Sequence, residues 1–128
     1  MWLLEVSHWE YLALRDQNRC FDTIDGKFTY SVCVMQKVTQ KEGEGGDVEL
    51  GVFSSAEVNE ETGGVILHYT AGAHCWGLNE PRRADVFVVC GEEDKVLSAT
   101  EPSTCYYTFQ MESPAACTDK FAAIHSLI

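Results

Sequence analysis

The sequence from Glu101 to Cys117, EPSTCYYTFQMESPAAC, combines a carboxylate, a turn proline, two cysteines and a Tyr-Tyr pair. From Cys105 onward it alternates as a strand does, which places Tyr107 and Phe109 on the same face. Glu101 and Tyr107 lie on either side of Cys105, so a disulfide at this cysteine would hold two polar groups in a fixed arrangement. The stretch therefore predicts a rigid ligand-binding edge in a small domain of strands.

The chain has 128 residues, the usual size of a single domain, and six of them are cysteines. The cysteines stand at positions 20, 33, 75, 90, 105 and 117 and form no CxxC or CxxH pair, the spacing that zinc sites usually use. Disulfides are therefore favoured over a metal site, and no cofactor is expected. Because disulfides persist in oxidising compartments, the chain is predicted to work in the secretory pathway or outside the cell.

The formal net charge of −11 argues against nucleic acid as a partner, because nucleic-acid binding rewards clustered Lys and Arg. The same charge disfavours phosphorylated or sulfated ligands, and a neutral polar ligand suits it better. No apolar run is long enough for a transmembrane helix, and the apolar start at Met1–Leu4 is too short for a signal peptide. We therefore expect no membrane span.

The N-terminal third of the chain contains a predicted hairpin. Phe21–Ile24 and Lys27–Cys33 are rich in β-forming residues, and Asp25-Gly26 between them is a strong turn signal. Cys20 and the cysteine that ends the second run stand at the distal ends of the hairpin, where a bridge is geometrically natural. The second strand is expected to continue toward Gln40.

The segment from Lys41 to Gly64 is rich in glycine and acidic residues and is predicted to be the least ordered part. A short strand is expected within it, at Val48–Phe53. Its carboxylates could suggest Ca²⁺, but the EF-hand spacing is absent, so a solvated loop is the favoured interpretation.

Strand signals return after Gly64, separated by glycines and prolines. The predicted strands are Val65–Thr70, Asp85–Cys90, Lys95–Ala99 and Cys105–Met111. Short strands with a turn every ten residues or so (~10) are typical of an all-β protein, either a barrel or a flattened sandwich.

No catalytic motif is found in the sequence. The nucleophile motif G-x-S-x-G is absent, the Gly-rich run lies in an acidic segment that would repel phosphate, and the four histidines form no ligand pattern. Paired carboxylates could cleave glycosides, but Asp and Glu are too common here for that signal to count. The sequence therefore predicts a binding domain rather than an enzyme.

A neutral sugar requires planar groups that bond pairs of hydroxyls, and an aromatic ring over its apolar face. Side chains of these types lie near the cysteines: Gln40, Arg82, Glu101, Tyr107 and Trp76. Plainer explanations exist for each. Arg82 could pair with a neighbouring carboxylate, and Glu101 could begin a turn. Tyr107 and Trp76 could be core side chains.

Five pieces of this sequence resemble, in their order, the mannose 6-phosphate receptor homology (MRH) family. They are Cys33-x6-Gln40, Gly72-x2-Cys75-Trp76, Arg82-x7-Cys90-Gly91, Glu101-Pro102-x2-Cys105-x-Tyr107 and Pro114-Ala-Ala-Cys117. The resemblance covers about Tyr11 to Cys117, and within the family it is closest to the domain of glucosidase II beta subunits. Each motif alone is weak, but their order around six cysteines is specific.

The resemblance implies a flattened β-barrel or sandwich of two antiparallel sheets, as in P-type lectins. The chain would divide into an N-terminal segment packing on the domain (1–19), the MRH domain (20–117) and a C-terminal tail (118–128). The implied disulfides are Cys20–Cys33, Cys75–Cys105 and Cys90–Cys117.

The resemblance also implies a sugar site. Its four polar residues carry over as Gln40, Arg82, Glu101 and Tyr107, and the candidate aromatic ring is Trp76. One residue more than usual separates Trp76 from Arg82, and a second arginine, Arg83, follows. Counting back from Cys90 selects Arg82, and strand alternation places Arg83 on the opposite face.

The function implied by the resemblance is a non-catalytic lectin for terminal mannose of high-mannose N-glycans in the lumen of the endoplasmic reticulum. In the resembled subunits this domain presents glycoproteins to a separate catalytic alpha subunit of glucosidase II. Three alternatives stay open: the gamma subunit of the lysosomal-enzyme phosphotransferase, a lectin of endoplasmic-reticulum degradation, and an interaction module that has lost sugar binding. A glycosidase is the least favoured.

Overall fold

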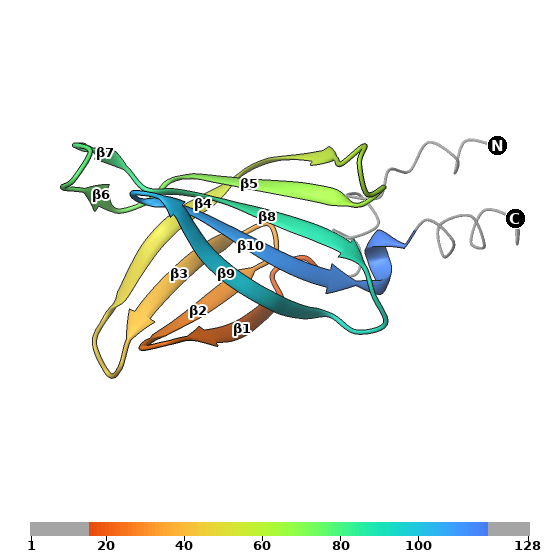
Figure 1. Ribbon diagram of the computed structural model, residues 1–128, viewed down its shortest axis with the longest axis horizontal. Coiled ribbons are helices and arrows are strands. Elements are labelled where there is room, and N and C mark those ends of the chain that lie inside the picture. The colour runs from red at the N-terminus through yellow and green to blue at the C-terminus, as the bar shows by residue number, and fades with distance from the viewer. Residues whose placement is uncertain (1–15, 118–128) are drawn as a thin grey trace, which may run out of the picture.

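The computed structural model describes residues 16–117, which form ten strands and a short 3-10 helix (Figure 1). The elements are β1 (Cys20–Asp25), β2 (Phe28–Cys33), β3 (Lys37–Glu42), β4 (Asp47–Val58), β5 (Val65–Ala71), β6 (His74–Cys75), β7 (Glu80–Pro81), β8 (Arg83–Cys90), β9 (Lys95–Ser103), β10 (Tyr106–Ser113) and η2 (Pro114–Ala116). Of the predicted flanking segments, only residues 16–19 fall within the described part.

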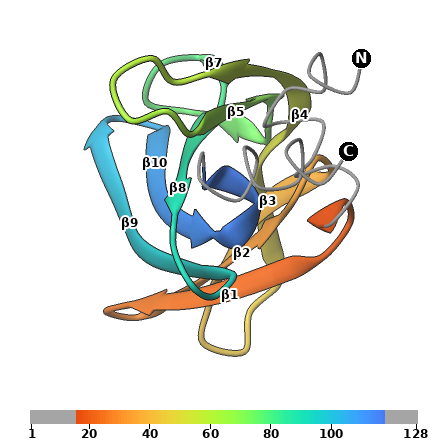
Figure 2. The same ribbon diagram turned by 90° about the vertical axis from the view of Figure 1, so that its right-hand side faces the viewer.

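Eight of the strands form one sheet in the order β1-β2-β3-β4-β5-β8-β10-β9, and β6 pairs with β7 separately. Pairing in the large sheet is antiparallel except between β8 and β10, which run parallel. The sheet curls until its edge strands β1 and β9 lie side by side, giving a nearly closed barrel (Figure 2). The predicted all-β, disulfide-bridged barrel is confirmed.

The barrel is filled by the inward-facing residues of its strands. The largest fully buried side chains include Leu50, Leu67, Tyr69, Phe109 and Met111. Burial alternates along β10 as the sequence predicts, and Tyr107 and Phe109 are buried in the core. Each large apolar side chain buried in this way contributes about 1.5–3 kcal/mol to folding. The strands predicted after Gly64 are confirmed as β5, β8, β9 and β10.

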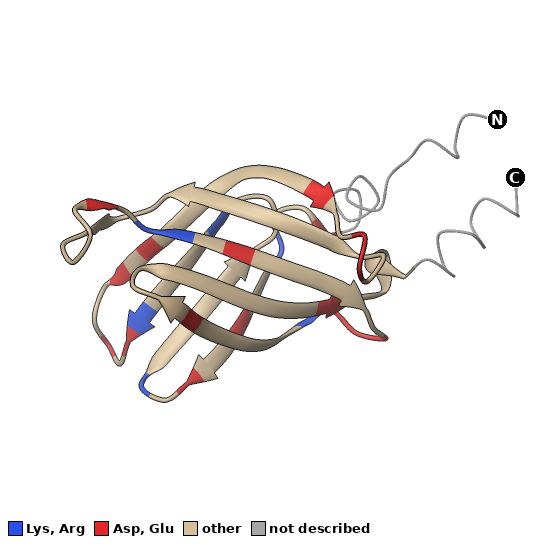
Figure 3. Cartoon of the chain, turned by 45° about the horizontal axis from the view of Figure 1, so that its top comes forward, with Lys and Arg blue, Asp and Glu red and all other residues tan. Residues whose placement is uncertain are grey.

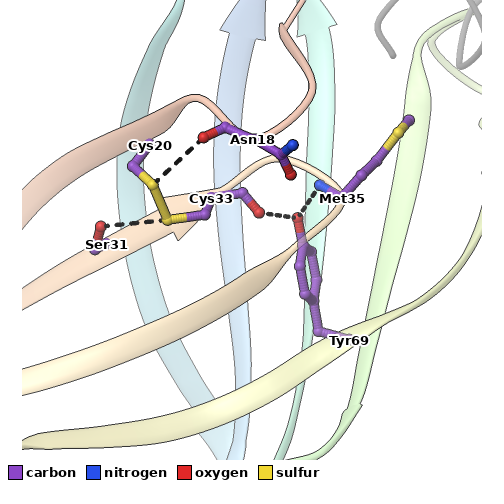
Figure 4. Close-up of a disulfide and its surroundings, with 6 residues drawn as sticks. All are labelled: Asn18, Cys20, Ser31, Cys33, Met35 and Tyr69. Carbon is purple, nitrogen blue, oxygen red and sulfur yellow. Dashed lines mark hydrogen bonds between the residues drawn. A yellow bond between two sulfur atoms is a disulfide. The ribbon is translucent and has the colours of Figure 1, made fainter.

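The expected continuation of the second strand toward Gln40 is wrong. β2 ends at Cys33 and the chain reverses, with Met35 in the left-handed region at φ 58°. The hydroxyl of Tyr69 donates to the carbonyl of Cys33 at 3.0 Å and accepts from the N–H of Met35 at 3.2 Å, which satisfies the backbone of this turn (Figure 4). Gln40 therefore lies on the next strand, opposite Tyr30 of β2.

The segment from Lys41 to Gly64 is also more ordered than predicted. Instead of a short strand at Val48–Phe53, β4 runs for 12 residues, from Asp47 to Val58. It pairs with β3 along one edge and with β5 along the other, and this tertiary pairing overrides the weak local β-propensity of its acidic residues.

Three disulfides connect the strands. The bridges join Cys20 to Cys33, Cys75 to Cys105 and Cys90 to Cys117. All three pairings implied by the family resemblance are therefore present. The second bridge connects β6 to the turn between β9 and β10, and the third connects the end of β8 to the end of η2.

Candidate functional site

Arg82 lies between β7 and β8, and hydrogen bonds fix both its backbone and its side chain. Its N–H donates to the carbonyl of Ala73 at 3.0 Å, and its carbonyl accepts from Gly72 at 2.9 Å. The guanidinium Nη1 donates to the carbonyls of Ala73 and His74, while Nε donates to the Tyr107 hydroxyl at 3.4 Å. The half-buried side chain is therefore aimed at β10.

The extra residue between Trp76 and Arg82 is accommodated in the turn that joins β6 to β7. The carbonyl of Cys75 accepts from the N–H groups of both Leu78 and Asn79, and Asn79 has φ 56°. Asparagine tolerates this left-handed conformation better than most residues. Since the turn absorbs the additional residue, the backbone of Arg82 keeps its bonds to residues 72 and 73.

Arg83 faces the other way. Its guanidinium carbon lies 3.9 Å above the centre of the Tyr106 ring, whose hydroxyl donates to Asp85 at 2.7 Å. Tyr106 and Tyr107 are neighbours on β10 and point to opposite faces of the sheet. Because Arg82 contacts Tyr107 and Arg83 contacts Tyr106, the two arginine side chains lie on opposite faces. The choice of Arg82 over Arg83 as the sugar-binding arginine stays a prediction.

Glu101 and Tyr107 are held together by the turn between β9 and β10. One carboxylate oxygen of Glu101 accepts from the N–H of Cys105 at 2.8 Å, and Cys105 has φ 60° and is bridged to Cys75. The exposed carboxylate therefore has a fixed orientation, although it begins no turn of its own: it lies within β9, which continues to Ser103.

Gln40 is hydrogen-bonded to Tyr30, which is not among the site residues predicted from the sequence. Its Nε2 donates to the hydroxyl of Tyr30 at 3.1 Å. Burial raises the pKa of Tyr30, the Gln40 hydrogen bond opposes that rise, and the nearby Asp25, Tyr107 and Glu101 add to it. The Tyr30 hydroxyl is therefore a hydrogen-bond partner of Gln40. The alternation of β2 could have indicated an inward tyrosine, but not its partner on β3.

Trp76 lies on the surface of the protein. Its side chain is 85% exposed, at the turn between β6 and β7, and its ring packs edge-on against His74 with the centroids 4.3 Å apart. The alternative that Trp76 is a core side chain is wrong. Trp76 follows β6, which the Cys75–Cys105 bridge joins to the turn between β9 and β10. β6, β7 and this turn lie at the end of the barrel away from η2 (Figure 1).

Acidic side chains outnumber basic ones in this chain. Over the described residues, Asp and Glu are spread across strands and loops, with fewer Lys and Arg among them (Figure 3).

Within residues 16–117 no group of three or more His, Cys, Asp and Glu side chains is placed to hold a metal ion. In the same range, the structure contains no helix with the length and apolarity needed to cross a membrane.

Comparison with protein families gives a match along most of the chain. The family model described as "Glucosidase II beta subunit-like protein" matches residues 9–128. The chain belongs to this family. The MRH domain predicted from the cysteine and site motifs is thereby confirmed.

Individual relatives agree with this assignment. The bovine glucosidase 2 subunit beta is 33% identical over 104 residues, which cover 80% of this chain but 19% of the bovine protein. The human N-acetylglucosamine-1-phosphotransferase subunit gamma is 28% identical over 109 residues, or 80% of this chain and 34% of that protein. The chain therefore spans about a fifth of the beta subunits that it matches.

A solved structure shares both sequence and fold with this MRH domain. It is a crystal structure of the MRH domain of glucosidase II beta bound to mannose, 33% identical with a TM-score of 0.67. The match covers 80% of this chain and 97% of that domain.

Proposed function

We propose that this MRH domain is a non-catalytic lectin that binds terminal mannose of high-mannose N-glycans. The side chains proposed to bind the sugar are Gln40, Arg82, Glu101 and Tyr107, with Trp76 as an exposed aromatic ring near them. The observation that carries the proposal is the convergence of Arg82 on Tyr107, next to the turn that orients Glu101. The mannose bound to the related domain supports the choice of sugar.

The hydrogen bonds within the site leave a mixed set of donors and acceptors for a ligand. Arg82 uses Nε and Nη1 on the protein, so Nη2 remains as a donor for a ligand. Glu101 uses one carboxylate oxygen on Cys105, which leaves the other as an acceptor. The hydroxyl of Tyr107 accepts from Arg82 and can donate its own proton.

Such a set suits a neutral polyol, whose hydroxyls each donate and accept. The 6-phosphate of mannose keeps the other ring hydroxyls but adds a negatively charged group, which the net charge of −11 disfavours. This electrostatic argument favours unphosphorylated mannose over its 6-phosphate.

The wider role follows from the family and is part of the proposal. We place the protein in the lumen of the endoplasmic reticulum, as the non-catalytic subunit that presents glycoproteins to a catalytic glucosidase II alpha subunit. The contact with the alpha subunit would be made through other parts of the full-length protein. Identity to the beta subunit above that to the phosphotransferase gamma subunit favours this role over the gamma-subunit alternative.

An interaction module that has lost sugar binding is the second candidate, motivated by the additional residue before Arg82. The fixed direction of the Arg82 side chain argues against it, because the longer turn has not moved the guanidinium away from Tyr107.

A glycan array tests the proposal directly. The wild-type domain is expected to bind high-mannose glycans with exposed terminal mannose, and Arg82→Ala to lose most of that signal. Arg83→Ala is the matched control, because its side chain lies on the other face of the sheet. An array on which the folded wild-type domain gives no signal above background would rule out the lectin function.

A further inference from the structure

Tyr30 occupies a position from which it can control the orientation of a site residue. It lies on β2 directly opposite Gln40 of β3, and its hydroxyl accepts a hydrogen bond from Gln40 Nε2 at 3.1 Å. Its side chain is 6% exposed, and its ring packs edge-on against Phe109 with the centroids 5.4 Å apart. The register of the two strands and the core together hold the hydroxyl beside the amide.

We propose that Tyr30 is a positioning residue that fixes the Gln40 amide with Nε2 toward the protein and Oε1 toward the bound sugar. The inference rests on the proposed sugar site and adds a residue and a polarity to it. A glutamine amide has a donor end and an acceptor end of nearly equal size, so without a fixed partner it could present either one. In the structure the Tyr30 hydroxyl accepts from Nε2, and this observed direction leaves Oε1 as the end of the amide available to the ligand.

The choice of orientation has a chemical consequence for the ligand. With Oε1 facing the sugar, Gln40 accepts a hydrogen bond from the ligand, so the sugar hydroxyl opposite Oε1 must donate one. Glu101 likewise offers an acceptor oxygen. Two acceptors on the protein therefore require two donating hydroxyls, which reinforces selection for a sugar with free hydroxyls over a substituted one.

The first arm of the test compares two Tyr→Phe variants, each of which deletes one hydroxyl. Tyr30→Phe is expected to weaken binding of methyl α-mannoside, measured by titration, by about two- to tenfold, the equivalent of one neutral hydrogen bond. Tyr69→Phe is the control, because the Tyr69 hydroxyl bonds to Cys33 and Met35 in the turn between β2 and β3 rather than to a site residue (Figure 4). It should lower the thermal midpoint but leave the affinity for methyl α-mannoside unchanged.

The second arm needs no sugar. In the ligand-free wild-type domain, the ¹⁵N order parameter of the Gln40 side-chain amide should be high, because Tyr30 restrains it. Tyr30→Phe should lower that order parameter, and Tyr69→Phe should not. The resonance is assigned from its disappearance in Gln40→Glu. A purely structural role for Tyr30 would move the thermal midpoint without moving the order parameter of this one amide.

The outcomes separate the two proposals. If Gln40 is as restrained in Tyr30→Phe as in the wild type, or if both Tyr→Phe variants weaken mannose binding equally, the positioning role is wrong even though the domain is a lectin. If the order parameter falls as expected but the wild-type domain binds no sugar, the positioning role holds and the proposed function fails.

Discussion

The guanidinium Nε of Arg82, the residue between β7 and β8, donates to the hydroxyl of Tyr107 at the beginning of β10 across 3.4 Å. The next residue after Arg82 and the residue before Tyr107 contact each other instead: Arg83 stacks on Tyr106 on the outer face of the sheet. The contact therefore distinguishes two adjacent arginines that sequence counting alone can confuse by one position.

The first prediction uses this distinction. Arg82→Ala should weaken binding of methyl α-mannoside at least tenfold (~1.4 kcal/mol or more), because it removes a charge-assisted donor and leaves its partners unpaired. Arg83→Ala should leave the affinity nearly unchanged. Isothermal titration of both variants, with thermal midpoints recorded to show that they are folded, checks the prediction. Loss of binding in Arg83→Ala alone would show that the site arginine has been assigned one residue too early.

Glu101→Gln should also weaken mannose binding by about tenfold or more, because the carboxylate accepts charge-assisted hydrogen bonds that an amide makes more weakly. The bond from the N–H of Cys105 can persist to the amide oxygen, so the turn should keep its shape. Tyr107→Phe removes a single hydroxyl and should cost less. The same titration compares the two, and a larger loss in Tyr107→Phe than in Glu101→Gln would contradict this ranking.

The disulfides predict a redox result. All six cysteines are paired, so the oxidised domain should weigh six hydrogens less than the reduced chain, two for each bridge. No site should react with iodoacetamide in denaturant. Reduction should lower the free energy of unfolding by about 2–4 kcal/mol for each bridge lost. Two or more alkylated thiols in the untreated protein would contradict both the pairing and the assignment to an oxidising compartment.

Chelation is expected to leave sugar binding intact. The proposed site relies on side-chain donors and acceptors, and among residues 16–117 there is no cluster of three or more His, Cys, Asp and Glu side chains placed for a metal. Binding of methyl α-mannoside in EDTA should therefore equal binding in buffer with Ca²⁺. A loss on chelation that Ca²⁺ restores would direct attention to the acidic segment around Asp47.

We expect the stability of the fold to depend on pH through His68, on the outer face of the sheet. Burial alone would lower the pKa of His68, but its hydrogen bonds to Asp85 at 2.7 Å and Glu57 at 3.0 Å, together with their charges, raise it above the ordinary value. The protonated ring therefore stabilises the fold fully below the unfolded pKa of about 6.5. That stabilisation is lost as the pH rises through the higher folded pKa.

Thermal midpoints measured across this range provide the check. The wild type should lose more stability than His68→Asn as the pH rises from below the unfolded pKa to above the folded one. Glu57→Gln removes one of the two carboxylate charges beside His68 and should give an intermediate slope. Parallel curves for the wild type and His68→Asn would show that this network contributes nothing that depends on protonation.

Local patterns were enough to predict a large part of this protein. The strands after Gly64, the hairpin of β1 and β2 and the inward face of β10 all follow from alternation and turn residues, which depend on near neighbours in sequence. The hairpin turn lies one residue later than predicted, at Gly26 and Lys27, because Asp25 pairs with Phe28. The three bridges and the family came from the order of motifs around the cysteines.

Other features depend on strands that are distant in the sequence, and alternation carries no information about which strands meet. The length of β4 is fixed by its pairing with β3 and β5. The reversal after Cys33 is stabilised by a tyrosine hydroxyl from β5. The parallel pairing of β8 with β10 likewise depends on β9, which follows β8 in sequence but pairs with the other side of β10.

In the candidate site, too, some features follow from the local sequence and others from contacts between distant strands. The sequence by itself determined which residue types are present and that Arg82 and Arg83 would alternate. Only the tertiary structure decided that the Arg82 guanidinium meets Tyr107, that Trp76 is exposed rather than buried, and that Gln40 is oriented by a partner on β2. The physical reason is that a hydrogen bond between strands requires a register and a direction for both side chains, and these are set when the sheet curls into a barrel.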